Sequence, residues 1–91
     1  LGTSCLLLCV GLTMSIKLAT AVTLRLLRNE AGLSQEQLAR QSGIDRTYIS
    51  GVERSVRNIT LDSLEGLIGA LGVSSEEFIR RLHDELIKQT S

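Results

Sequence analysis

The chain has 91 residues, a formal net charge of zero at neutral pH, no proline, one tyrosine and one phenylalanine. A chain of this length forms one small domain with a marginal core, which leucine, isoleucine, valine and alanine must build. Their helical spacing predicts an all-α fold and argues against a β-rich domain. Neither an enzyme nor a cofactor is expected, because so small a bundle does not easily surround a substrate and no catalytic set of side chains stands out.

Residues 1–13 differ from the rest because none of them is charged. We expect a non-native or accessory apolar segment there, with a natural start at Met14 and the folded domain over 14–91. A membrane or export signal and an apolar arm against a partner subunit stay open as alternatives. The apolar run is too short to span a bilayer, so no membrane association is expected. Cys5 and Cys9 have no nearby histidine, so no structural metal is expected.

The first predicted helix covers about residues 16–31. Its buried side is expected to consist of apolar residues at helical spacing: Leu18, Val22, Leu26 and Leu27. Gly32 is expected to end it, since glycine readily adopts the left-handed conformation that follows many helices.

Residues 34–54, SQEQLARQSGIDRTYISGVER, predict two short helices, at about 34–42 and 45–53, joined by a tight turn at Gly43. Ser34 and Gln37 have the spacing of a capping box, in which each satisfies a free backbone donor of the other. Asp45 can cap the second helix. The outer side of that helix is expected to carry Arg46, Thr47, Ser50 and Gly51. This pattern predicts a helix-turn-helix whose second helix enters a DNA groove.

Two further helices are predicted after a polar connection at 55–59. Thr60 is expected to cap the first of them, and Gly72 to end it. One apolar stripe runs along this helix: Leu61, Leu64, Leu67, Ile68 and Leu71. Ser74 and Glu77 predict a capping box for the last helix, which reaches about residue 89.

Charge is unevenly distributed along the chain. Residues 25–57 carry a net charge of +2 and residues 58–91 a net charge of −3. A surface can acquire such asymmetry by chance, but it modestly favours contact between the basic half and nucleic acid.

The stretch from Arg25 to Leu71 resembles the Cro/C1-type (Xre) helix-turn-helix of phage repressors and of restriction–modification controller proteins. The segments that carry the resemblance are LRLLRNEAGLSQEQLA, SGIDRTYISGVER and LDSLEGLIGALGVS. The resemblance implies a compact five-helix bundle of the lambda-repressor-like type that binds double-stranded DNA through its major groove.

Two positions match a structural ion pair of that family, Arg28 with Glu53, and a partly buried charge does need such a partner. Other positions match the family's DNA contacts. Gln35 matches a phosphate-binding glutamine, with a solvated polar residue as the alternative. Arg46 and Thr47 match the leading base-contacting positions, although a phosphate contact or a salt bridge with Asp45 or Glu36 stays open for Arg46.

The remaining expected DNA contacts follow along the same helix and the loop after it: Ser50, Tyr48, Arg54, Arg57 and Asn58. The Tyr48 hydroxyl is expected to reach a phosphate, with a core or rim tyrosine as an equal alternative. The sequence departs from the family at Gly51, where some repressors place a base-reading amide. It also departs at Ser55 and Ile59, in place of the usual glycine and proline.

The last helix carries more large apolar residues than a small bundle needs. We expect four of them to form a two-fold dimer interface, with a wholly intramolecular helix as the alternative: Phe78, Ile79, Leu82 and Leu86. Such a dimer separates two recognition helices by roughly 34 Å and predicts a palindromic operator.

The sequence therefore predicts a cytoplasmic, homodimeric transcriptional regulator that binds specific double-stranded DNA. Contact with RNA polymerase is open, with Glu36 as a candidate. The alternative function is an antitoxin-like protein-binding module that also autoregulates its operon.

Overall fold

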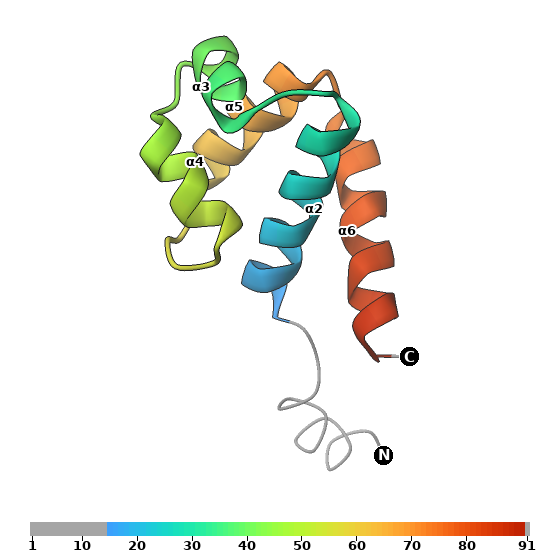
Figure 1. Cartoon of the computed structure of the whole chain (residues 1–91). Helices are drawn as coiled ribbons and strands as arrows, with labels where there is room; N and C mark the ends of the chain where they lie inside the picture. The colour runs from blue at the N-terminus through green and yellow to red at the C-terminus, as the bar shows by residue number, and fades with distance from the viewer. Residues whose placement is uncertain (1–14, 91) are drawn as a thin grey trace.

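Residues 15–90 are described by the computed structural model, with side chains up to Lys88, and they are all-α (Figure 1). The helices are α2 (Ile16–Glu30), α3 (Gln35–Ser42), α4 (Arg46–Glu53), α5 (Leu61–Leu71) and α6 (Ser75–Thr90). The prediction of a five-helix, all-α fold is confirmed. The expectations for residues 1–13 concern a segment outside the described residues. Within residues 15–90 no helix is long and apolar enough to cross a lipid bilayer.

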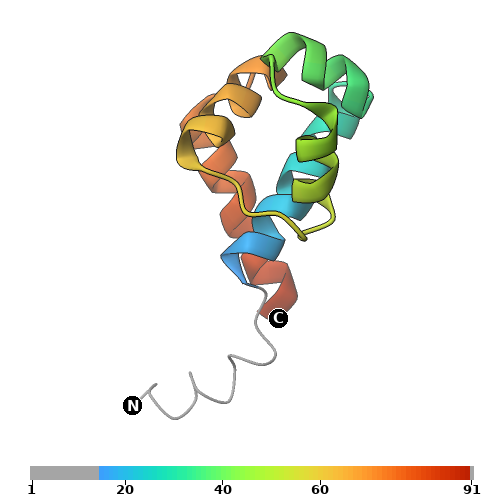
Figure 2. The same ribbon diagram turned by 90° about the vertical axis from the view of Figure 1, so that its left-hand side faces the viewer.

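Helices α2 and α6 lie side by side, α4 and α5 also pack against α2, and α3 packs against α4 and α5 (Figures 1 and 2). The connection between α4 and α5 crosses from one helix to the other near the start of α2 (Figure 2). The core lies between these helices. Its buried members are Leu24, Leu27, Leu38, Ile49, Val52, Leu67, Ile68, Leu71 and Phe78.

The buried side of α2 differs from the expected one. Leu18 is 42% exposed, and Val22 and Leu26 are only half-buried. Leu27 is buried as expected, together with residues that are mostly small: Ala19, Thr20, Ala21, Thr23 and Leu24. The prediction followed the largest apolar side chains. The helix instead turns its small residues inward, because small side chains let neighbouring helices pack closely against it.

Hydroxyl side chains cap four of the helix starts, as the sequence predicts for three of them. Ser34 accepts a hydrogen bond from the N–H of Gln37, whose side chain returns one to the Ser34 N–H. Three more backbone N–H groups are capped by Ser15, Thr60 and Ser74. The prediction for α4 is wrong: Asp45 holds the N-cap position but makes no side-chain capping hydrogen bond.

The turn between α3 and α4 depends on a glycine. Gly43 has φ +76°, and its N–H donates to the carbonyl of Ala39 at 2.8 Å. Residues with a side chain rarely adopt this left-handed backbone conformation. Glycine adopts it without strain, so Gly43 ends α3 and redirects the chain into α4. The predicted turn is confirmed.

Candidate DNA-binding surface

A buried polar network fixes helix α4 against α2. The Arg28 guanidinium donates to both carboxylate oxygens of Glu53, at 2.7 Å from Nε and 3.0 Å from Nη2. The two side chains are only 11% and 4% exposed. Arg28 also donates to the carbonyl of Leu33, at 2.8 Å. A two-bonded pair of this kind sets the orientation as well as the distance of the helices it joins. The predicted ion pair is therefore present.

Gln35 extends this network. Its Nε2 donates to Glu53 Oε1 at 2.9 Å, so the side chain lies against the last residue of α4. Gln35 is therefore half-buried and hydrogen-bonded, not the solvated polar residue that the sequence analysis gave as the alternative. Its expected contact with a DNA phosphate stays a prediction, and would use the part of the amide that does not bond Glu53.

The first turn of α4 presents its polar side chains to solvent. Arg46 and Thr47 are exposed, and Ser50 is half-buried one turn further on. Within residues 15–90 Arg46 makes no ion pair, whereas Glu36 pairs with Arg40 at 3.9 Å. The alternative of a salt bridge for Arg46 is therefore not supported. Its five N–H donors remain available for a planar acceptor such as a guanine edge.

The connection after α4 folds back along that helix. The carbonyl of Gly51 accepts hydrogen bonds from the N–H groups of Val56 and Arg57, at 3.0 and 3.2 Å. Ser55 takes φ +62° to make this reversal. The family's usual glycine suits such a conformation better than serine does. The geometry of the connection, which the sequence left in doubt, is therefore set by a strained serine.

Tyr48 attaches this connection to α4. Its hydroxyl donates to the carbonyl of Asn58 at 3.2 Å and accepts from the N–H of Thr60 at 3.3 Å. The Arg57 guanidinium lies over its ring, 5.3 Å from the centroid. Because the only hydroxyl proton goes to Asn58, the structure favours the rim tyrosine over the phosphate contact, which stays a prediction.

Gly51 is not on the outer side of α4, where the sequence analysis placed it. It is buried, and a Cβ at this position would lie 3.2 Å from the Cβ of Arg57. The folded-back connection covers the face of α4 that carries Gly51, so this backbone is not open to DNA. Nothing local in the sequence signals that contact.

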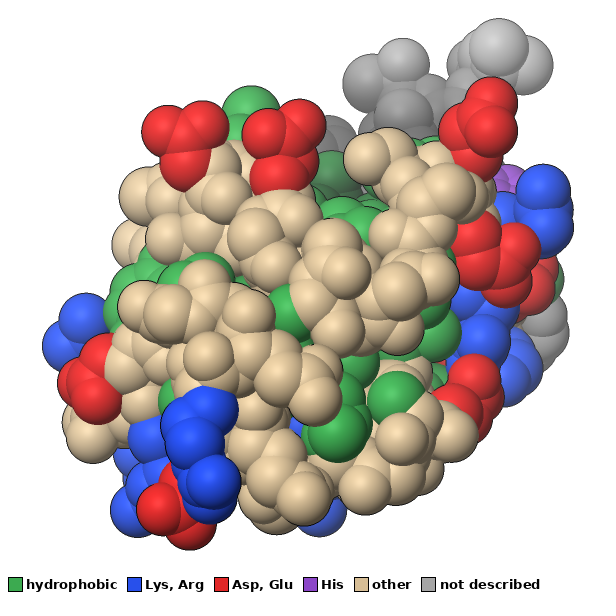
Figure 3. Space-filling view, turned by 90° about the horizontal axis from the view of Figure 1, so that it is seen from above, with side chains coloured by type: hydrophobic (Ala, Val, Ile, Leu, Met, Phe, Trp, Pro, Cys, Tyr) green, Lys and Arg blue, Asp and Glu red, His purple; other side chains and the backbone are tan. Residues whose placement is uncertain are grey.

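The candidate surface therefore combines the start of α4 with the loop that follows it. Arg54, Arg57 and Asn58 are exposed, and neither arginine has an acidic partner within the described part of the chain. Arg54 Nε only bonds the carbonyl of Ser50, at 3.4 Å. The end of the molecule seen from above is different: acidic and basic side chains are interspersed around its edge (Figure 3). Unpaired positive charge is thus available beside α4.

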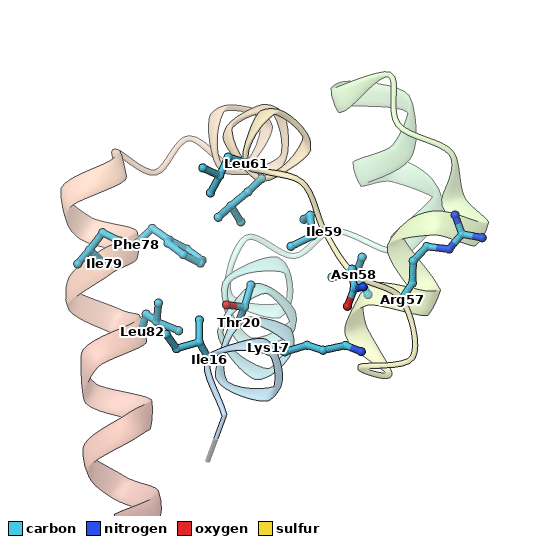
Figure 4. Close-up of a pocket in the computed structure, with 12 residues that line it drawn as sticks. Ile16, Lys17, Thr20, Arg57, Asn58, Ile59, Leu61, Phe78, Ile79 and Leu82 are labelled. Atoms are coloured by element: carbon cyan, nitrogen blue, oxygen red, sulfur yellow. The ribbon is translucent and has the colours of Figure 1, made fainter. Parts of the chain in front are cut away.

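A second surface feature is an apolar groove of about 440 Å³. It lies between α6, the start of α2 and the residues just before and within α5 (Figure 4). Three large apolar residues on its lining are strongly exposed: Ile16, Leu61 and Ile79, at 68%, 80% and 58%.

Phe78 also faces the groove but is only 1% exposed and belongs to the core, which corrects its expected place in a dimer interface. Leu82 and Leu86 are half-buried. Of the expected interface residues, Ile79 is therefore the most accessible. Leu61 and Ile16 were missed, since Leu61 was assigned to a buried stripe and Ile16 only marked the start of a helix.

Two adjacent short helices, with the second exposed and braced by a buried ion pair, define a helix-turn-helix protein. A helix-turn-helix family model matches residues 24–78, and the chain belongs to that family. Its relatives place it in the Cro/C1 type, which confirms the resemblance noted in the sequence. It is 48% identical over 68 residues to the control protein C.SmaI of Serratia marcescens, a match that covers 75% of this chain and 81% of that one.

A second relative is described as a hypothetical transcription factor of Neisseria meningitidis, 45% identical over 64 residues. That match covers 70% of this chain and 60% of the relative. Among solved structures, the restriction–modification controller protein C.Esp1396I has a TM-score of 0.79 and 39% identity over 81% of this chain and 97% of that one. The same controller protein has been solved as a tetramer in complex with its natural 35-base-pair operator.

Proposed function

We propose that the chain is a transcriptional regulator of the controller-protein or repressor type that binds specific sites in double-stranded DNA. The observation that carries this proposal is the exposed first turn of α4, where Arg46 has no acidic partner within residues 15–90 while Glu53 anchors the other end of the helix. A fixed helix with a free arginine at its leading end suits major-groove readout. Arg54 and Arg57 add sequence-independent attraction to phosphates.

The proposed active form is a homodimer on a palindromic operator. The apolar groove supports this, because Leu61 and Ile79 expose more apolar surface than an isolated monomer needs. The tetrameric operator complex of the related C.Esp1396I supports an oligomer as well. A cytoplasmic location, no enzymatic activity and a contact between exposed Glu36 and RNA polymerase complete the proposal.

The experiment that tests the proposal is selection of bound duplexes from random DNA. A recovered motif with two inverted half-sites about one helical turn apart is expected. The Arg46→Ala variant should lose affinity for the motif more than for unrelated DNA, and Arg80→Ala on α6 is the matched control. Recovery of no motif would contradict sequence-specific binding. Equal losses for both DNAs would reduce Arg46 to a phosphate contact.

The dimer is tested separately by sedimentation. Ile79→Glu places a charge beside the groove and should convert a dimer into a monomer. Val56→Glu alters another exposed apolar residue, one that does not line the groove, and should leave the mass unchanged. An unchanged mass for Ile79→Glu would exclude the groove as the interface.

A further inference from the structure

Gly51 differs from the other helical glycines in what lies next to it. A Cβ there would meet three atoms of one side chain: Cβ, Cδ and Nε of Arg57, at 3.2, 3.7 and 3.8 Å. In α5, a Cβ at Gly69 would meet no atom of the described residues within 4 Å, and one at Gly66 would lie 3.5 Å from Ile44 Cδ1. Only at Gly51, of these three, would a methyl group meet a neighbour more closely than ordinary van der Waals contact.

The stem of Arg57 lies across Gly51, and its head continues along the same side of α4. The Arg57 N–H donates to the Gly51 carbonyl at 3.2 Å, which fixes the start of the side chain. The guanidinium then reaches the ring of Tyr48, three residues before Gly51 on the helix. Residues three apart share one helix face. Figure 4 shows the Arg57 side chain leaving the loop and pointing away from the apolar groove.

We propose that Gly51 is a positioning residue that seats Arg57 on the side of the recognition helix. Without a side chain at position 51, the arginine packs along α4 and stacks on Tyr48. Its guanidinium is thereby held over the Tyr48 ring, on the same helix as Arg46. The inference rests on the proposed function, since it assigns Arg57 to the DNA contact, and it deepens that function by naming what orients the contact.

The contact between Gly51 and Arg57, called the seat below, predicts an unusual effect of alanine at position 51. Alanine favours a helix more than glycine does, so a glycine that serves no purpose is improved by alanine. A methyl group at position 51 instead crowds the Arg57 Cβ, which moves only with the backbone of the connection, so the connection and the arginine it carries must shift by a few tenths of an ångström. Gly51→Ala is therefore expected to weaken DNA binding while changing the thermal unfolding midpoint little, because the helix preference of alanine offsets the cost of that shift.

The test is a double-mutant cycle on a duplex obtained by the selection described above. Gly51→Ala should reduce affinity about tenfold, the size of one lost polar contact. In the Arg57→Ala background the same change should alter affinity less than twofold, since there is no arginine left to misplace. Gly69→Ala is the matched control and should not change affinity. An unchanged affinity for Gly51→Ala, or an equal loss in both backgrounds, would overturn the seat.

A measurement without DNA separates the seat from the proposed function. Protons of the Arg57 side chain should show ring-current shifts from Tyr48 in NMR spectra, and these shifts should shrink in Gly51→Ala. Unchanged shifts would overturn the seat even if the protein binds its operator. Shrunken shifts in a protein that selects no duplex would leave the seat in place and contradict the proposed function.

Discussion

Helix α2 is held by one arginine–carboxylate pair at each of two faces, and the two pairs differ in their surroundings. Arg28 joins α2 to Glu53 of α4, with side chains 11% and 4% exposed. Glu30 joins α2 to Arg81 of α6, with side chains 55% and 27% exposed. Each pair has two hydrogen bonds. They are alike in geometry, so their difference lies in burial and in further partners.

The buried pair belongs to a network with Gln35 and the Leu33 carbonyl, whereas the outer pair lies at the exposed surface between α2 and α6. A charge removed from the first leaves its partner buried without compensation. A charge removed from the second leaves its partner in water. Helix α4 is therefore oriented by directional polar contacts, whereas α6 contributes the apolar side chain of Phe78 to the core.

The largest expected effect follows from breaking the buried pair. Arg28→Ala should lower the free energy of unfolding by about 3–5 kcal/mol, because Glu53 stays buried without its partner. Urea denaturation measures the loss. Arg81→Ala is the control and should shift the midpoint far less. Similar shifts for both variants would show that burial does not separate the two pairs.

A smaller effect of opposite sign is expected on the buried face of α2. Thr23 is 1% exposed, and its hydroxyl has no hydrogen-bond partner among the residues that the structure describes. A buried hydroxyl without a partner carries an uncompensated loss of hydration. Thr23→Val, of similar shape, should therefore raise the free energy of unfolding by about 1 kcal/mol.

Thr20→Val makes the same change at a residue that lines the apolar groove (Figure 4). Solvent reaches that position more easily, so its effect should be smaller. A lower free energy of unfolding for Thr23→Val would show that the Thr23 hydroxyl stabilises the fold. The buried face of α2 would then depend on polar contacts, as the contact between Arg28 and Glu53 does.

The connection after α4 offers a still smaller stabilisation. Ser55 has φ +62°, a conformation that costs a residue with a side chain about 1–2 kcal/mol. Glycine avoids this cost but loses more freedom on folding, so Ser55→Gly should add about 0.5 kcal/mol. Chemical denaturation would detect the gain, with Ser55→Ala as a control that should add nothing.

The smallest effect concerns pH and the outer pair. Hydrogen bonding to Arg81, and its positive charge, hold the pKa of Glu30 below its ordinary value of about 4.5, against a smaller opposing effect of burial. The pair therefore stabilises the fold above that pH, and its contribution is lost as pH falls through the lowered pKa, where Glu30 takes up a proton.

Comparison of the wild type with Glu30→Gln from pH 7 to pH 3 checks this. The difference in unfolding midpoint should vanish at the acidic end. A difference that persists at pH 3 would mean that Glu30 acts through packing rather than charge.

The features that the sequence predicts well are local ones. The Ser34–Gln37 box and the turn at Gly43 depend only on neighbouring residues, and both are present as expected. The Arg28–Glu53 pair lies 25 residues apart and was reached through the spacing of a family. The proposed contacts of Arg46 and Thr47 with bases stay predictions, because α4 alone does not define the DNA opposite it.

The misplaced residues depend on how distant segments fold onto one another. Gly51 was assigned to the outer face because the connection at 55–59 was not known to fold back over α4. Phe78 was assigned to a dimer interface because helical spacing alone does not decide which apolar side chains the monomer buries. In each case the sequence located the helix correctly, and a contact from another segment determined which face was covered.

The position of Tyr48 between the recognition helix and its loop also gives the protein a built-in optical reporter. The chain contains no other tyrosine and no tryptophan, so its intrinsic emission comes from this one ring. Arg57 lies over the ring, and Asn58 and Thr60 bond the hydroxyl. Any event that shifts the loop against α4 should change the emission, so operator binding is expected to be observable in unlabelled protein.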